Sequence, residues 1–209
     1  MIETEVRSNA AEVAVRYDKA PALISTTLVK VLRRIGAGLE RHVKREKLQG
    51  QVLTRRTGTL MRAIYTKILL EASARDAVLV LGADTKKAAG ARLQEYGGVV
   101  VPRNAQYLTI PLDAARTSAG VARLSASEFI RNPQALGFDH SFVNKRKTVI
   151  MGARDVGGET VAEPVFALKK RVVIPERSYL RSSVRDRKAA ILQELGLGTK
   201  EAVTEALTT

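Results

Sequence analysis

The chain has 209 residues, 45% of them hydrophobic, which is enough to bury a core in one sizeable domain or two small ones. It has no cysteine, and its only histidines, His42 and His140, lie far apart, so we expect no disulfide, no metal site and no cysteine nucleophile. Lysine and arginine number 35 against 21 acidic residues, and this net charge of +14 favours an acidic partner such as nucleic acid or an acidic protein surface.

The first predicted element is a long helix over residues 21–48. Its apolar residues recur at three- and four-residue intervals, a period typical of one buried stripe: Ile24, Leu28, Val31, Leu32, Ile35, Leu39 and Val43. The preceding residues 1–20 lack the apolar stretch of a secretory signal, and no window is apolar enough to cross a membrane. We therefore expect a protein that is made and stays in the cytosol, unless a larger particle carries it.

Shorter elements follow the long helix. Thr57 is placed to cap a helix that begins at Gly58. Strands are predicted at residues 65–72 and 77–81 around a polar turn at 73–76. One or two helical turns then end at the Gly-Gly pair of "QEYGG", and "VVVP" and "QYLTIPL" predict two more strands.

The second half of the chain alternates between weak and strong patterns. Residues 113–144 show little periodicity apart from a helix predicted at 125–131, so we expect an extended arm that leaves the core and orders against an adjacent subunit. Alternating patterns at 147–153 and 164–175 predict strands, and a helix over 182–195 is expected to stop at Gly196. The remainder, 197–209, is expected to be a loosely held tail.

This order of elements predicts an α+β fold. We expect a long N-terminal helix and a C-terminal helix packed on a mainly antiparallel β-sheet. The predicted domain spans residues 21–196, with residues 1–20 as a separate N-terminal segment.

The positive charge is concentrated in two blocks. Residues 30–62 carry a net charge of +8 and residues 145–188 carry +7. A basic helix face is typical either of simple exposure to solvent or of contact with an anionic partner. The residues that we consider for contact with DNA or an acidic partner are Lys30, Arg33, Arg34, Arg41, Lys44, Arg45, Arg55, Arg56, Lys145, Arg146, Lys147, Lys169, Lys170 and Arg171.

The patterns of known reactive sites are missing from the sequence. There is no glycine-rich phosphate loop and no G-x-S-x-G elbow, and the carboxylates are scattered singly, so we expect neither enzymatic activity nor a cofactor. Aromatic residues make up only 4% and include no tryptophan, which leaves few platforms for stacking single-stranded bases. Contact with nucleic acid would therefore depend on charge and weaken with salt.

Three short motifs occur in a fixed order over roughly residues 20–195. They are "RTGTL" with Thr57, Gly58 and Leu60, "QEYGG" with Glu95, Tyr96 and Gly97, and "VIPERSYL" with Ile174, Pro175, Arg177, Tyr179 and Leu180. In these three motifs and in their order, the chain resembles the tail-completion (virion morphogenesis, minor tail or neck) proteins of long-tailed bacteriophages. Two positions depart from the family pattern, since Ser178 replaces a second proline and Tyr179 replaces a phenylalanine.

The resemblance implies a structural virion protein at the head-proximal end of the tail or in the neck. It implies a homo-oligomeric ring, expected to be hexameric, that contacts a tail terminator, the tail tube or a head connector. The basic surplus would then line a DNA channel or meet an acidic neighbouring ring. The motif around Tyr179 has two interpretations, a turn that holds the fold or part of a subunit contact. The alternative to the whole assignment is a free basic DNA-binding protein.

Overall fold

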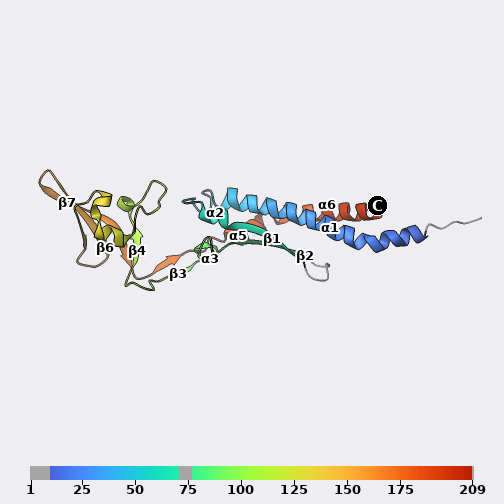
Figure 1. Cartoon of the computed structure of the whole chain (residues 1–209), viewed down its shortest axis with the longest axis horizontal. Helices are drawn as coiled ribbons and strands as arrows, with labels where there is room; N and C mark the ends of the chain where they lie inside the picture. The colour runs from blue at the N-terminus through green and yellow to red at the C-terminus, as the bar shows by residue number, and fades with distance from the viewer. Residues whose placement is uncertain (1–9, 71–76, 209) are drawn as a thin grey trace, which may run out of the picture.

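The molecule is elongated, with helices gathered at one end, a sheet at the other and a narrow connection between them (Figure 1). The computed structural model describes residues 10–70 and 77–208. We call three parts of it the helical lobe (10–70, 77–96 and 175–208), the ribbon (97–100 and 172–174) and the sheet lobe (101–171).

The helical lobe is built along α1 (Ala10–His42), which continues into a π-helical turn, η1 (Val43–Lys47). Buried aliphatic side chains such as Val31 and Ile35 follow one another at helical spacing on a single face. The predicted long helix is confirmed. It begins earlier than expected, with Pro21 inside it, because a proline removes one helical hydrogen bond without always ending the helix.

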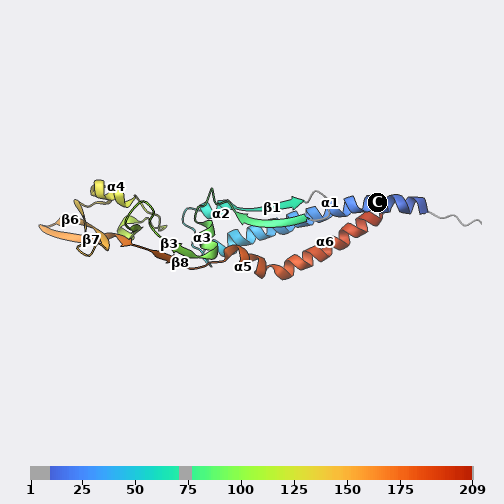
Figure 2. The same cartoon turned by 90° about the horizontal axis from the view of Figure 1, so that it is seen from below.

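Two C-terminal helices, α5 (Tyr179–Asp186) and α6 (Lys188–Thr208), return along the lobe, and α6 lies beside α1 (Figure 2). The predicted stop at Gly196 and the loose tail after it are wrong for the described residues, because α6 continues through both of its glycines. Gly198 faces Val31, where an added Cβ would lie 2.8 Å from Val31 Cγ1. This glycine therefore permits close approach of two helices instead of ending one.

A β-hairpin completes the helical lobe. The short helix α2 (Thr59–Ala63) leads into β1 (Ile64–Leu70), which pairs antiparallel with β2 (Ala77–Ala83). Both strands were predicted, whereas the predicted turn at 73–76 lies outside the described residues. The helix starts one residue later than expected, since Gly58 is its N-cap in a left-handed conformation, with φ 73°.

The sheet lobe contains four antiparallel strands in the order β4-β7-β6-β5. They are β4 (Leu108–Pro111), β5 (His140–Val143), β6 (Val149–Val156) and β7 (Glu159–Lys169). The core of the lobe is a cluster of phenylalanines, in which the ring of Phe129 lies 5.8 Å from that of Phe138 and 5.9 Å from that of Phe166.

Residues 113–144 differ from the extended arm that was expected. They form η2 (Asp113–Ala115), α4 (Ala126–Arg131), η3 (Pro133–Leu136) and β5, and they contribute Phe129 and Phe138 to the core. The predicted helix at 125–131 is confirmed and begins with a capping box between Ser125 and Glu128. The periodicity was weak because each of these short elements supplies only one or two buried side chains.

The ribbon pairs β3 (Gly98–Val100) with β8 (Val172–Ile174) in antiparallel register, from Gly98 opposite Ile174 to Val100 opposite Val172. The remaining helix, α3 (Ala91–Tyr96), precedes it. The predicted α+β class with antiparallel strands is confirmed. The strands are divided among three sheets, and the long helices pack on the β1-β2 hairpin rather than on the four-stranded sheet.

Candidate functional site

The second and third motifs meet where the ribbon joins the helical lobe, and we call this place the junction. Backbone hydrogen bonds connect them directly, because the amide of Arg177 donates to Gln94 O (3.0 Å) and the amide of Ser178 donates to Glu95 O (3.0 Å). Residues more than 80 positions apart in sequence are thus held together by main-chain atoms.

Glu95 is the central side chain of the junction. Only 3% of it is exposed, and its carboxylate accepts hydrogen bonds from the amides of Leu180 (2.8 Å) and Arg181 (3.1 Å). These amides lie at the N-terminus of α5, whose N-cap residue Ser178 supplies no side-chain bond of its own. The carboxylate of Glu95 therefore caps α5 from another segment and complements the positive end of the helix.

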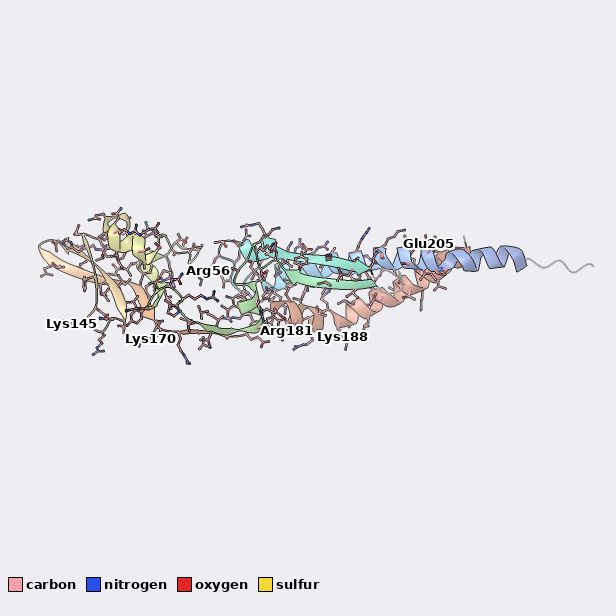
Figure 3. The ribbon with its side chains drawn as sticks, turned by 60° about the horizontal axis from the view of Figure 1, so that its bottom comes forward. Arg56, Lys145, Lys170, Arg181, Lys188 and Glu205 are labelled. Atoms are coloured by element: carbon pink, nitrogen blue, oxygen red, sulfur yellow. The ribbon has the colours of Figure 1, made fainter. Side chains whose placement is uncertain are left out.

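Arg181 extends the junction to the surface. Its Nε donates to Glu95 Oε1 (3.0 Å), and its guanidinium lies 4.6 Å from the ring centre of Tyr96 and also pairs with Glu176. The hydrogen bond to Glu95 raises the pKa of Arg181. The sequence did not single out this arginine, because its partners are distant along the chain. The labelled side chain is visible in Figure 3.

At two positions of the motifs, the residue type follows from the local geometry and hydrogen bonding of the backbone. Gly97 has φ 69°, and an added Cβ would lie 2.7 Å from the amide nitrogen of Glu176 and 2.9 Å from Ile174 O, so no larger residue fits. Pro175 follows the last residue of β8, as expected of a residue that cannot donate to a strand ladder. Both residues set the path of the chain from the ribbon into α5.

Tyr179 is fully buried in the helical lobe. It packs with Val43, Leu48 and Ile64, and its hydroxyl donates to Ala91 O (3.2 Å). Burial, followed by the charge of Glu95, raises the pKa of the tyrosine to about 12. Of the two interpretations that the sequence left open, these contacts favour a role in holding the fold. Leu60 and Leu180 pack partly buried around the same cluster.

The first motif lies beside the junction at an open cavity of about 570 Å³. Thr57, Gly58 and Leu60 line it together with Arg55 and Arg56. Among the described residues, no group of three or more His, Asp or Glu side chains is placed to hold a metal ion. The two histidines lie in different lobes, His42 near Asp186 and His140 on β5.

The structure separates the candidate basic residues into groups. Six lie on α1 and η1, where Lys44 pairs with Glu40 and Arg34 with Glu194. Arg55 and Arg56 precede α2, and the guanidinium of Arg56 lies near Gly120 of the sheet lobe. The other six, Lys145, Arg146, Lys147, Lys169, Lys170 and Arg171, lie at one end of the four-stranded sheet, where Figure 3 labels Lys145 and Lys170.

Comparison of the chain with protein-family models, curated proteins and solved structures found no match. No helix in the described part of the chain is both long and apolar enough to span a bilayer.

Proposed function

We propose that this protein is a structural component of a phage virion that assembles as a ring at the head-proximal end of the tail or in the neck. The observation that carries the assembly part of the proposal is the apolar surface that the described residues expose. Leu70 and Val173 are each 60% exposed and Leu197 is 59% exposed. Exposed apolar surface of this kind marks sites of association between proteins.

Exposed apolar side chains support association of copies. On the ribbon, Val99 and Val173 pair across the two strands and are 56% and 60% exposed. A two-stranded sheet with open edges is marginal alone and is a template for further pairing. On α6, Leu192 and Leu197 are 58% and 59% exposed. Such surfaces are typical of protein interaction sites.

The phage assignment is supported by the resemblance of the motifs, two of which build the junction. Glu95 and Tyr179 hold α5 against α3 within the helical lobe, and Gly97 permits the close backbone contact with Glu176 where the ribbon begins. The resemblance therefore concerns residues at the point where the ribbon leaves the helical lobe. A narrow, elongated subunit is suited to packing side by side around a ring.

The first experiment is light scattering of the purified full-length protein, alone and mixed with isolated phage tails, followed by imaging of the complexes. We expect binding at one end of the tail with a ring-like number of copies. The variant Val99→Asp with Val173→Asp should weaken this association, whereas Thr109→Asp on β4, also exposed, should not.

A compact monomer with no affinity for tails would overturn the proposal. If the same monomer bound duplex DNA tightly at about 150 mM salt, the free DNA-binding protein would be the better assignment.

A further inference from the structure

Six basic residues form what we call the basic edge: Lys145, Arg146, Lys147, Lys169, Lys170 and Arg171. The first three occupy the turn between β5 and β6, and the others lie at the end of β7, where Lys169 is the last residue of the strand and Lys170 and Arg171 follow it. The two stretches are neighbours, since the amide of Leu168 donates to Thr148 O (2.7 Å) and Val149 pairs with Ala167. All six side chains are exposed.

The charges of the basic edge are not neutralised within the described part of the chain, where none of the six forms an ion pair. On α1 and η1, Arg34, Lys44 and Lys47 have carboxylate partners. The basic residues there that form no ion pair in the described chain, Lys30, Arg33, Arg41 and Arg45, are spread over about four helical turns instead of lying together. Six adjacent positive charges without partners repel one another, so they favour binding of a polyanion.

The turn that carries Lys145–Lys147 is ordered by Asn144. The side-chain oxygen of Asn144 accepts from the amides of Thr148 (2.8 Å) and Val149 (3.1 Å), and its carbonyl accepts from the amide of Lys147 (2.8 Å). These bonds fix the backbone, so that the three basic side chains project from a defined turn.

Lys147 occupies a conformation that glycine would adopt without strain. Its φ is 51°, and Ser178 is the only other non-glycine residue with positive φ in the described ranges. Because glycine would relieve this strain, the presence of a lysine at this position is a reason to look for a function of its side chain. Here that side chain adds a third charge to the turn.

We propose that the basic edge binds the phosphate backbone of duplex DNA. Four of its six residues are lysines, which are depleted at protein interfaces but are regular partners of phosphate. Neighbouring strands lie about 4.8 Å apart, so both basic stretches reach the same run of phosphates. This inference rests on the proposed function in one respect only, the place where the contact is made. In a ring, that place is the channel through which the DNA passes.

The test measures binding of the full chain to a short duplex as salt rises from about 50 to 200 mM. The turn variant carries Lys145→Gln, Arg146→Gln and Lys147→Gln. The control variant removes the same charge from exposed positions on α1 and η1, through Arg33→Gln, Arg41→Gln and Arg45→Gln. We expect the turn variant to bind at least about tenfold more weakly at low salt and to lose roughly 2.7 from the slope of log K against log salt, whereas the control changes little.

Lys147→Gly separates binding from folding. Glycine relieves the left-handed strain, so the melting temperature should stay the same or rise, while DNA binding at low salt weakens by up to about fivefold. Unchanged binding in both Lys147→Gly and the turn variant would overturn the proposal. Equal weakening in the turn and control variants would also overturn it, in favour of diffuse charge.

Poly-glutamate is the probe for an acidic protein surface. If it binds the basic edge and duplex DNA cannot displace it, the partner is an acidic protein and the proposal fails. Association with tails is measured separately on the same variants. If the unmodified protein associates with tails but does not bind duplex DNA, the DNA site alone is overturned, and if it binds DNA but does not associate with tails, the ring function alone is overturned.

Discussion

The two lobes of this molecule are stabilised by different interactions. The helical lobe combines an aliphatic stripe along α1, represented by Val31 and Ile35, with the polar contacts of Glu95 at the junction. The sheet lobe has a compact aromatic core around Phe129 and no comparable buried carboxylate among its described residues. None of the four hydrophobic clusters found in the described chain contains residues from both lobes. We therefore expect the lobes to lose stability separately.

The largest expected effect is that of Phe129→Ala. Removing a fully buried phenyl ring should cost about 3–5 kcal/mol, confined to the sheet lobe. Hydrogen exchange read by mass spectrometry resolves both lobes and should show faster exchange within residues 101–171 only. Ile130→Ala on the same helix is the control, because this side chain is 51% exposed and its loss should change stability by less than about 0.5 kcal/mol. Equal loss of protection in the helical lobe would show that the two lobes unfold as one.

Glu95→Ala should destabilise the helical lobe by about 2–4 kcal/mol, since the amides of Leu180 and Arg181 lose their acceptor. Urea unfolding followed by circular dichroism measures the loss. Glu176→Ala removes only the exposed partner of Arg181 and should cost less than about 1 kcal/mol. If both variants are equally stable, Glu95 does not hold the junction.

The stability of the helical lobe should depend on pH because of the buried phenol of Tyr179. Folding raises the pKa of this phenol from 10.0 to about 12, so its neutral form is the one that the fold favours. The associated stability is fully present below pH 10 and is lost as pH rises to about 12, by about 2–3 kcal/mol.

Urea midpoints measured across that interval should fall less steeply in Tyr179→Phe than in the unmodified protein. Tyr96→Phe removes a phenol that is 58% exposed and should leave the steep fall in place. Identical pH curves for Tyr179→Phe and the unmodified protein would contradict the burial of the Tyr179 hydroxyl.

The smallest expected effects are those of alanine substitutions at the two glycines of α6. An alanine at Gly198 would press on Val31 and should cost about 1–2 kcal/mol after the gain in helix propensity. An alanine at Gly196 meets no atom within 4 Å and should stabilise the helix by up to about 1 kcal/mol. Thermal unfolding of both variants tests the packing of α6 on α1, and equal shifts would contradict it.

Local patterns in the sequence predicted much of the fold. The stripe on α1, the strands β1 and β2 and the end of β8 before Pro175 are all set by residues close to one another in the chain. The continuation of α6 was missed, because Gly196 was interpreted as a helix stop, whereas the helix continues past it and packs on α1, where Gly198 meets Val31 from a distant part of the sequence.

The candidate site was predicted less completely than the fold. The motifs contained Glu95 and Tyr179, but neither spacing nor composition indicated that Glu95 caps α5 or that Arg181 joins it. Likewise, the fourteen basic residues could not be ranked from the sequence, because whether each has a carboxylate partner depends on tertiary contacts such as Arg34 with Glu194.

The register of the ribbon has a consequence for how such a protein can change. The chain leaves the ribbon for the sheet lobe after Val100 and re-enters the ribbon at Val172, and these two residues lie opposite each other. The whole of residues 101–171 is thus an insertion whose two ends are neighbours, and a tight turn at the ribbon would close the chain without it. A gene can exchange or lose such a module as a unit, altering what the far end of the molecule meets while the packing of α1 and α6 is preserved.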